Sequence, residues 1–303
     1  MTAKLLIGLD ATHMDTMLVQ QAVFYCRHLP VSKVVFLHVV ASEQIPRRLR
    51  SAYDYLSPMP EDVARKRIEE CLQQHFVASE TPDYELVIEH GNITEMMLVK
   101  ARDTRADLLV LGKKVDQPGQ GISSSRMAQM APCPVVFIPE TAPQQMHRIL
   151  VPVDFSEHAA MALQEAYAWG RSFGAQVICH HVIGLPSTYY PYIPSDKVER
   201  ELVEDAQNRY KVFLEKNGID ENTPCHFTIG RMDNPAHDVY AHAQREGAHL
   251  IAIGARGRTP AASFVLGSLA ARLAYAPYAI PILVHKSQNE RLGLLKALKE
   301  RLF

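Results

Sequence analysis

The sequence predicts an α/β protein made of two tandem copies of one domain, each with a five-stranded parallel sheet between helices. Four short segments of the first half recur in the second half in the same order, at a nearly constant spacing of about 143 residues. Residues 4–12 resemble residues 148–156, and residues 106–114 resemble residues 248–256. Within each copy, short apolar runs alternate with longer segments of helical apolar period, which is typical of a parallel sheet.

The repeat divides the chain into three parts. We expect a first domain over residues 1–141, a second domain over residues 147–286 and an amphipathic C-terminal helix over residues 287–303. The joint at residues 141–147 is polar and contains proline, as is typical of a linker. A length of 303 residues agrees with two domains.

The second copy shows the expected order of elements most clearly. Its first strand is the apolar run 149–154, and Ser156 follows as the N-cap of a helix that Gly174 ends. The next helix has an apolar stripe, with Ser195 as its N-cap and Gly218 as its terminator. The later elements in order are strand 176–183, helix 196–218, strand 225–230, helix 235–247, strand 249–254, helix 269–276 and strand 280–286.

Composition and charge exclude several classes of protein. The formal net charge is −1, so no overall field attracts the chain to nucleic acid or to anionic lipid. No run approaches the ~18 apolar residues of a membrane helix, and the N-terminus lacks the long apolar region of a secretory signal. We therefore expect a cytoplasmic protein without a nucleic-acid or membrane partner.

The positions of cysteine and histidine indicate no metal centre. The five cysteines lie far apart without a CxxC pair, which favours reduced thiols over a redox or zinc site. The fourteen histidines include no HExxH motif, and the adjacent His180 and His181 lie in a strand, where they face opposite sides. His237 and His242 are five residues apart on a helix and do not share a face well. We expect structural or surface roles for these histidines.

A loop with three glycines follows the fourth strand of the second copy. Gly254 can turn the chain with a positive φ, Gly257 allows close backbone approach to a ligand, and Gly267–Ser268 open the last helix. Arg256 and Arg258 add positive charge. Ligands of doubly wound sheets bind beyond the carboxyl ends of the strands, where backbone N–H groups can hold a phosphate. The alternative is a long surface loop without a ligand.

The spacing of these glycines resembles the ATP-binding pattern G-x2-G-x9-G-[ST] of the universal stress protein family. The segments GARGRT and VLGSLAARLAYAP are also typical of that family, and the chain is identified as a tandem member along nearly its whole length. The resemblance implies a flavodoxin-like domain, related to the adenine-nucleotide α-hydrolases, with strand order 3-2-1-4-5. It also implies that the fifth strands of two domains pair as in a dimer, here within one molecule.

The resemblance further implies that the second domain binds ATP, with Mg²⁺ or Mn²⁺ on the phosphates. The end of the first strand and a position on the second strand contact adenine and ribose, while the glycine loop holds the phosphates. Asp154 can also serve as a helix cap. Leu269 departs from the family pattern, because many nucleotide binders have another hydroxyl residue just after Ser268. The implied site residues are Pro152, Val153, Asp154, Val182, Gly254, Arg256, Gly257, Arg258, Gly267, Ser268 and Leu269.

The first copy lacks much of this loop. Gly112 matches the first glycine, but Val115 stands at the second glycine position, and Gly121 is followed by Ile122 instead of Ser or Thr. Eight residues separate Gly112 from Gly121, against twelve between the matching glycines of the second copy. A valine side chain and a shortened loop obstruct the path of the phosphates. We therefore expect the second domain to hold the nucleotide.

These features predict an ATP-binding regulatory protein of the stress response and not a fast enzyme. The sequence contains no GxSxG elbow and no recognisable general base or metal pair beside the glycine loop. A slow ATPase or nucleotide-transferring enzyme remains an alternative, as does a scaffold whose loop binds no nucleotide. A homodimer and an unidentified protein partner stay open. The C-terminal helix either docks on its own domain or binds another chain.

Overall fold

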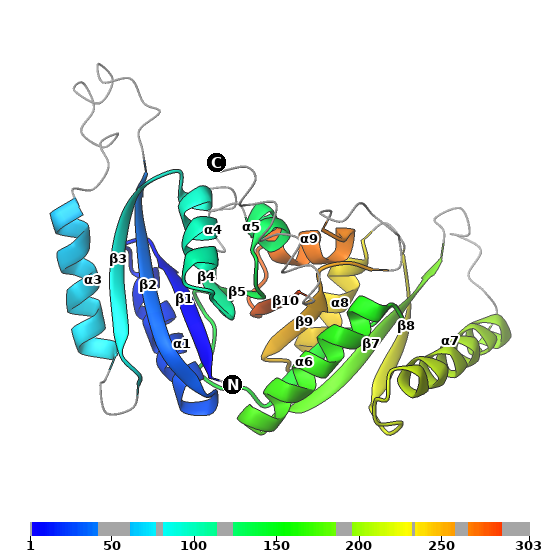
Figure 1. Ribbon diagram of the computed structural model, residues 1–303. Helices are drawn as coiled ribbons and strands as arrows, with labels where there is room; N and C mark the ends of the chain where they lie inside the picture. The colour runs from blue at the N-terminus through cyan, green and yellow to red at the C-terminus, as the bar shows by residue number, and fades with distance from the viewer. Residues whose placement is uncertain are drawn as a thin grey trace, which may run out of the picture.

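The computed structural model describes residues 2–41, 61–76, 81–113, 124–185, 196–231, 234–257 and 266–286. In this part of the chain the strands form one ten-stranded sheet in the order β3-β2-β1-β4-β5-β10-β9-β6-β7-β8 (Figure 1). Strands pair in parallel within each half. Each half therefore has the order 3-2-1-4-5, and the expected fold class is confirmed.

Helices and strands alternate through both halves. The first half contains β1 (Ala3–Leu9), α1 (Met14–His28), β2 (Val31–Ala41), α3 (Glu61–His75), β3 (Tyr84–Gly91), α4 (Ile93–Asp103), β4 (Leu108–Lys113), α5 (Ser124–Met130) and β5 (Val135–Pro139). The second half contains β6 (Arg148–Pro152), α6 (Glu157–Phe173), β7 (Gln176–Leu185), α7 (Asp196–Lys216), β8 (Cys225–Arg231), α8 (Pro235–Arg245), β9 (Leu250–Gly254), α9 (Ser268–Tyr275) and β10 (Ile282–His285).

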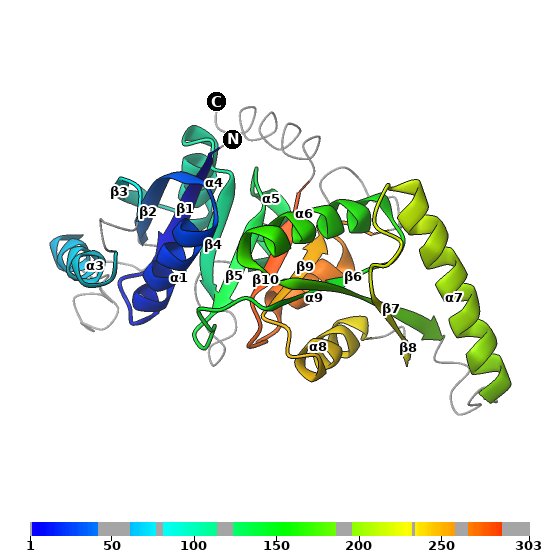
Figure 2. The same ribbon diagram turned by 90° about the horizontal axis from the view of Figure 1, so that it is seen from below.

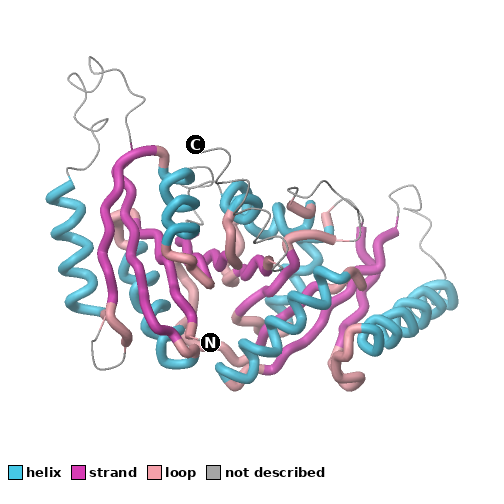
Figure 3. Tube along the Cα trace, in the orientation of Figure 1, coloured by secondary structure: helices cyan, strands magenta, loops and turns pink. Residues whose placement is uncertain are grey.

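Helices cover both faces of the sheet (Figures 1 and 2). One apolar core joins one face to α1, α3, α6 and α7, and a second core joins the other face to α4, α5, α8 and α9. Each strand feeds both cores because alternate side chains point to opposite faces, so Leu5 and Ile7 of β1 belong to the first core and Leu6 to the second. Figure 3 shows this three-layer arrangement by element type.

The two halves join edge to edge through their last strands, as the family resemblance implies. β10 pairs with β5 in antiparallel register. Each half also supplies a buried lysine to a helix end of the other half. Lys113 Nζ donates to the carbonyl of Leu273 in α9 over 3.1 Å, and Lys286 Nζ donates to the carbonyl of Gln129 in α5 over 2.6 Å. Carbonyls in the last turn of a helix have no partner within that helix, so these lysines cap both helices across the joint.

Most predicted helix ends in the second half are confirmed. Ser156 Oγ accepts the N–H of Ala159 at the start of α6, and Gly174 ends this helix with a φ of 66°. Gly218 follows α7 with a φ of 60°. The predicted cap Ser195 and the predicted helix 287–303 lie outside the described residues.

Two further expectations concern the chain as a whole. None of the described helices is long and apolar enough to cross a membrane. The five cysteines all lie in the described part of the chain and form no disulfide, which agrees with the thiols expected from their spacing.

Candidate functional site

The carboxyl edge of the second half brings together the ends of three neighbouring strands. β6 lies between β7 and β9, with Pro152 opposite His180 and Leu150 opposite Ile251. Since these strands are parallel, the segment after Pro152 and the loop after β9 leave the sheet at the same edge. This edge is where the sequence places its candidate ligand site.

A tight turn follows β6. Phe155 has a φ of 66°, a left-handed conformation that is uncommon for a residue with a side chain. Its ring stacks on the imidazole of His181 with 4.3 Å between ring centroids, and His181 Nδ1 lies 2.7 Å from the carbonyl oxygen of Val153. The turn leaves Asp154 half-buried at the edge, where its Oδ1 accepts the N–H of Ser156 over 3.1 Å.

The glycines of the loop permit two close approaches. A Cβ atom at Gly257 would lie 2.7 Å from Oδ2 of Asp154, so the loop rests directly on this carboxylate. A Cβ atom at Gly254 would lie 2.6 Å from the carbonyl oxygen of His158 in α6. The sequence predicts a positive φ at Gly254, and this prediction is wrong: Gly254 does not have a positive φ. Glycine is needed there because the first turn of α6 comes too close for any side chain.

The two ends of the loop meet at the start of α9. The N–H of Gly267 donates to the carbonyl of Ala255 over 2.8 Å, which closes the loop at its base. Gly267 is the N-cap of α9 and provides no side-chain cap, and the first turn has no acidic residue. Ser268 is exposed beside it. The N-terminal N–H groups of α9 therefore face the edge at which Asp154 lies, with the positive end of the helix dipole.

The other sequence-predicted residues are placed as follows. Pro152 and Val153 are buried in the strand end, and Val182 lies on β7, where its side chain packs against Gly230 of β8. Leu269 packs partly against the second core, and Arg256 is half-buried in the loop. Arg258 lies outside the described residues. The structure thus brings Asp154 and the glycine positions together, with Val182 one strand away.

A cavity of about 610 Å³ lies beside this edge, between the turn after β6 and α7. Sequence reasoning missed it, because its walls come from distant segments and carry no motif. It offers cationic groups close to the aromatic ring of Phe155. Its described lining is Phe155, Glu157, Asn208, Arg209, Val212, Phe213, Lys216 and Asn217.

The first half builds the same edge with a turn of the same conformation and different side chains. His38 Nδ1 lies 3.0 Å from the carbonyl oxygen of Leu9, and Ala11 has a φ of 58° at the position of Phe155. The buried carboxylate of Asp15 accepts the N–H groups of Asp10 and Ala11, each over 2.9 Å. Burial raises the pKa of Asp15 to about 7. The shortened loop of this half, residues 114–123, lies outside the described residues.

Two matches to one family model cover most of the chain. The model of the universal stress protein family matches residues 1–139 and residues 146–277. No curated protein sequence matches the chain significantly.

Solved structures of similar length share the fold. A functionally unknown protein from Pseudomonas aeruginosa PAO1, PA1789, has a TM-score of 0.63 at 14% identity, with 99% of this chain and 98% of that chain covered. A universal stress protein from Archaeoglobus fulgidus DSM 4304 has a TM-score of 0.61 at 16% identity, with 94% and 96% covered. At these identities the likeness concerns the fold alone.

Proposed function

This chain belongs to the universal stress protein family, and on that premise we propose that it is a cytoplasmic ATP-binding regulatory protein of the stress response. The second domain holds the nucleotide. One observation carries the proposal: Gly257 lies against the carboxylate of Asp154, so the two parts of the predicted site meet although about 100 residues separate them in the sequence.

The geometry supports separate binding places for the two parts of ATP. Asp154 and the backbone near Val182 lie at the strand ends and contact the adenine and ribose. The N-terminus of α9, uncapped by any side chain, receives the phosphates, because its N–H groups and dipole favour negative charge. Glycine at positions 254 and 257 lets the loop pass close to α6 and to Asp154, which keeps its backbone at the edge where the nucleotide binds. Mg²⁺ or Mn²⁺ accompanies ATP on the phosphate oxygens.

Mass spectrometry of ligand released from the purified protein separates this proposal from its alternatives. Co-purified ATP supports a binding protein, whereas ADP or AMP indicates the slow ATPase or nucleotide-transferring enzyme. A protein that carries no nucleotide and gives no heat signal when titrated with ATP and Mg²⁺ contradicts the proposal and favours the scaffold.

Two substitutions at Gly267 test the placement of the phosphates. Gly267→Asp sets a carboxylate at the start of α9, where it repels the phosphates, so calorimetric titration should show loss of ATP binding. Gly267→Ala is the matched control, because it adds the same Cβ, 3.3 Å from Cα of Arg256, without the charge. We expect the alanine variant to retain most of the affinity. Equal affinity of the aspartate variant and the wild type, with both folded by circular dichroism, would refute this placement.

A further inference from the structure

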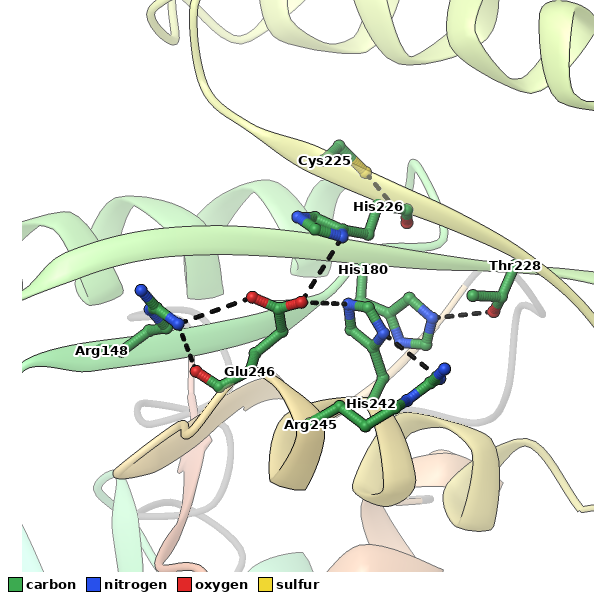
Figure 4. Close-up of polar contacts among 8 residues, drawn as sticks. All are labelled: Arg148, His180, Cys225, His226, Thr228, His242, Arg245 and Glu246. Carbon is green, nitrogen blue, oxygen red and sulfur yellow. Dashed lines mark hydrogen bonds and ion pairs between the residues drawn. The ribbon is translucent and has the colours of Figure 1, made fainter.

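A cluster of histidines lies on the sheet face opposite Phe155, between α8 and the strands β7 and β8. His226 is on β8, His242 is on α8, and Glu246 follows the last residue of α8 (Figure 4). His242 and Glu246 are four residues apart, so they lie on the same side of the helix end. None of the three contributes to the candidate nucleotide site.

The distances within this cluster suit a metal ion better than hydrogen bonds. Oε1 of Glu246 lies 3.8 Å from Nδ1 of His226 and 4.0 Å from Nε2 of His242. All three atoms lie within 4.8 Å of one another. These separations are too long for hydrogen bonds. Zinc bonds of about 2.0–2.1 Å place two ligand atoms of a tetrahedral ion ~3.3 Å apart, so a small inward movement brings all three into range.

An unsatisfied atom points to the same place independently. The side chain of His242 is only 6% exposed, and its Nε2 has no hydrogen-bond partner among the described residues. A buried polar atom without a partner destabilises the folded state, so such atoms are rare in folded proteins. A metal bond from Nε2 removes this cost.

Neighbouring side chains hold the three groups in position. The ring of His180 stacks on the ring of His242 with 4.1 Å between centroids, and His180 Nε2 lies 2.8 Å from Oγ1 of Thr228. Arg148 Nη1 lies 3.6 Å from Oε2 of Glu246 and also donates to the carbonyl of that residue. Figure 4 shows Glu246 between Arg148 on one side and the two histidines on the other. Such outer contacts orient the ligands of metal sites.

We propose that His226, His242 and Glu246 form a zinc-binding site in the second domain, with a fourth position open to water or another ligand. Two imidazoles and one carboxylate are a donor set that Zn²⁺ prefers, and three protein ligands leave one tetrahedral position open. The side chain of His226 is 44% exposed, so the ion has a path from solvent.

The positive charge of Arg245 should weaken zinc binding, so a substitution of this residue tests the proposal. Its Nη2 lies 3.5 Å from Nδ1 of His242. A guanidinium only donates, so this contact favours the tautomer with the proton on Nε2, the atom that must bind zinc. Zinc binding moves this proton to Nδ1, beside a positive charge. Arg245→Gln removes the charge and supplies an amide oxygen that accepts from Nδ1–H, so it should strengthen zinc binding.

The experiment titrates Zn²⁺ into the metal-free full chain against a competing chromophoric chelator in phosphate-free buffer. We expect about one Zn²⁺ per chain for the wild type. The His226→Gln variant should bind zinc with an affinity at least about tenfold lower. Because His226 is partly exposed, this substitution should not disturb folding. His237→Gln is the matched control, because His237 is an exposed histidine of the same helix outside the cluster. It should bind zinc as the wild type does, and Arg245→Gln should bind more tightly.

Cobalt identifies the donor atoms. Co²⁺ in the site should give the visible absorption of a tetrahedral ion without a thiolate charge-transfer band. A wild type that takes up no Zn²⁺ at micromolar concentration, equal affinities of wild type and His226→Gln, or a thiolate band would each overturn the proposal. ATP titrations of the same variants should be unchanged, so this result does not depend on the proposed function.

Discussion

At the scale of single residues, the turn after β6 shows how the structure sets the candidate site. Phe155 in the left-handed region costs on the order of 1–3 kcal/mol, and its stacking on His181 helps to offset that cost. Ala11 takes the same conformation in the first half. Because this strained turn recurs with different side chains, we infer that its purpose is to set the backbone direction at Asp154 and at Asp10.

Replacing Asp154 should weaken ATP binding. Asp154→Ala removes a carboxylate that accepts hydrogen bonds at the strand end, and we expect a loss of about 1–3 kcal/mol, that of a hydrogen bond to a charged group. Calorimetric titration with ATP and Mg²⁺ measures it. Asp10→Ala is the matched control in the first half and should change ATP affinity little. Equal losses in the two variants would mean that both domains bind ATP.

The buried Asp15 should make stability depend on pH. Burial raises the pKa of Asp15 from 3.8 to about 7, so the folded state binds this proton more tightly than the unfolded state does. The resulting stability is fully present below pH 3.8 and is lost as the pH rises through about 7. Asp15→Asn cannot titrate, so the wild type should lose about 2–3 kcal/mol relative to this variant between pH 5 and pH 8.

Urea unfolding of both proteins at several pH values measures this difference. The subtraction removes the contribution of the other titrating groups. A stability difference between Asp15→Asn and the wild type that stays constant from pH 5 to pH 8 would show that Asp15 is charged throughout that range.

At the scale of elements, two glycines of one loop should respond differently to the same change. Gly254→Ala forces a Cβ against the carbonyl oxygen of His158, a backbone atom that cannot move cheaply, so we expect a loss of about 1–3 kcal/mol of folding stability. Gly257→Ala meets the carboxylate of Asp154 instead, which can rotate away. It should leave the melting temperature nearly unchanged and weaken ATP binding. Thermal melts and ATP titrations of both variants make the comparison, and the reverse pattern would contradict it.

The elements themselves were predictable where one local signal dominates. Ser156 and Gly174 mark the ends of α6 because side-chain capping and a left-handed glycine act within a few residues. The strand order followed from the family resemblance. The reason for glycine at position 254 was not predictable, because the contact with His158 arises only when α6 packs on β9.

The histidine cluster escaped prediction for the same reason. His226 and His242 lie on different elements, 16 residues apart, and only the packing of α8 on β8 brings them together. The local signal was the spacing of four residues between His242 and Glu246, which places two metal-binding side chains on one side of a helix.

At the scale of the whole molecule, the two halves are related by their shared edge and by reciprocal contacts across it. Lys113 and Lys286 cap helix ends of opposite halves, and aromatic rings of α1 and α6 pack across the joint, with 5.5 Å between the centroids of Tyr25 and Trp169. Burial lowers the pKa of Lys113 to about 8, because the charged ammonium loses its contact with water. The hydrogen bond and the strand pairing at the joint must together offset this desolvation cost. We infer that each half is a structural partner of the other.

The full chain should bind about one ATP, held by the second half. Both halves build the same strand edge, but the first has Val115, Ile122 and a loop four residues shorter in its sequence, so we expect it to offer a triphosphate fewer main-chain donors. Calorimetric titration of the full chain with ATP and Mg²⁺ should give a stoichiometry near one, and Gly267→Asp should reduce it to near zero.

Gly121→Asp, the corresponding change in the first half, is the control and should leave the stoichiometry at one. Two equivalent sites on the wild type, or binding that survives Gly267→Asp and disappears in Gly121→Asp, would place the nucleotide in the first half as well or instead.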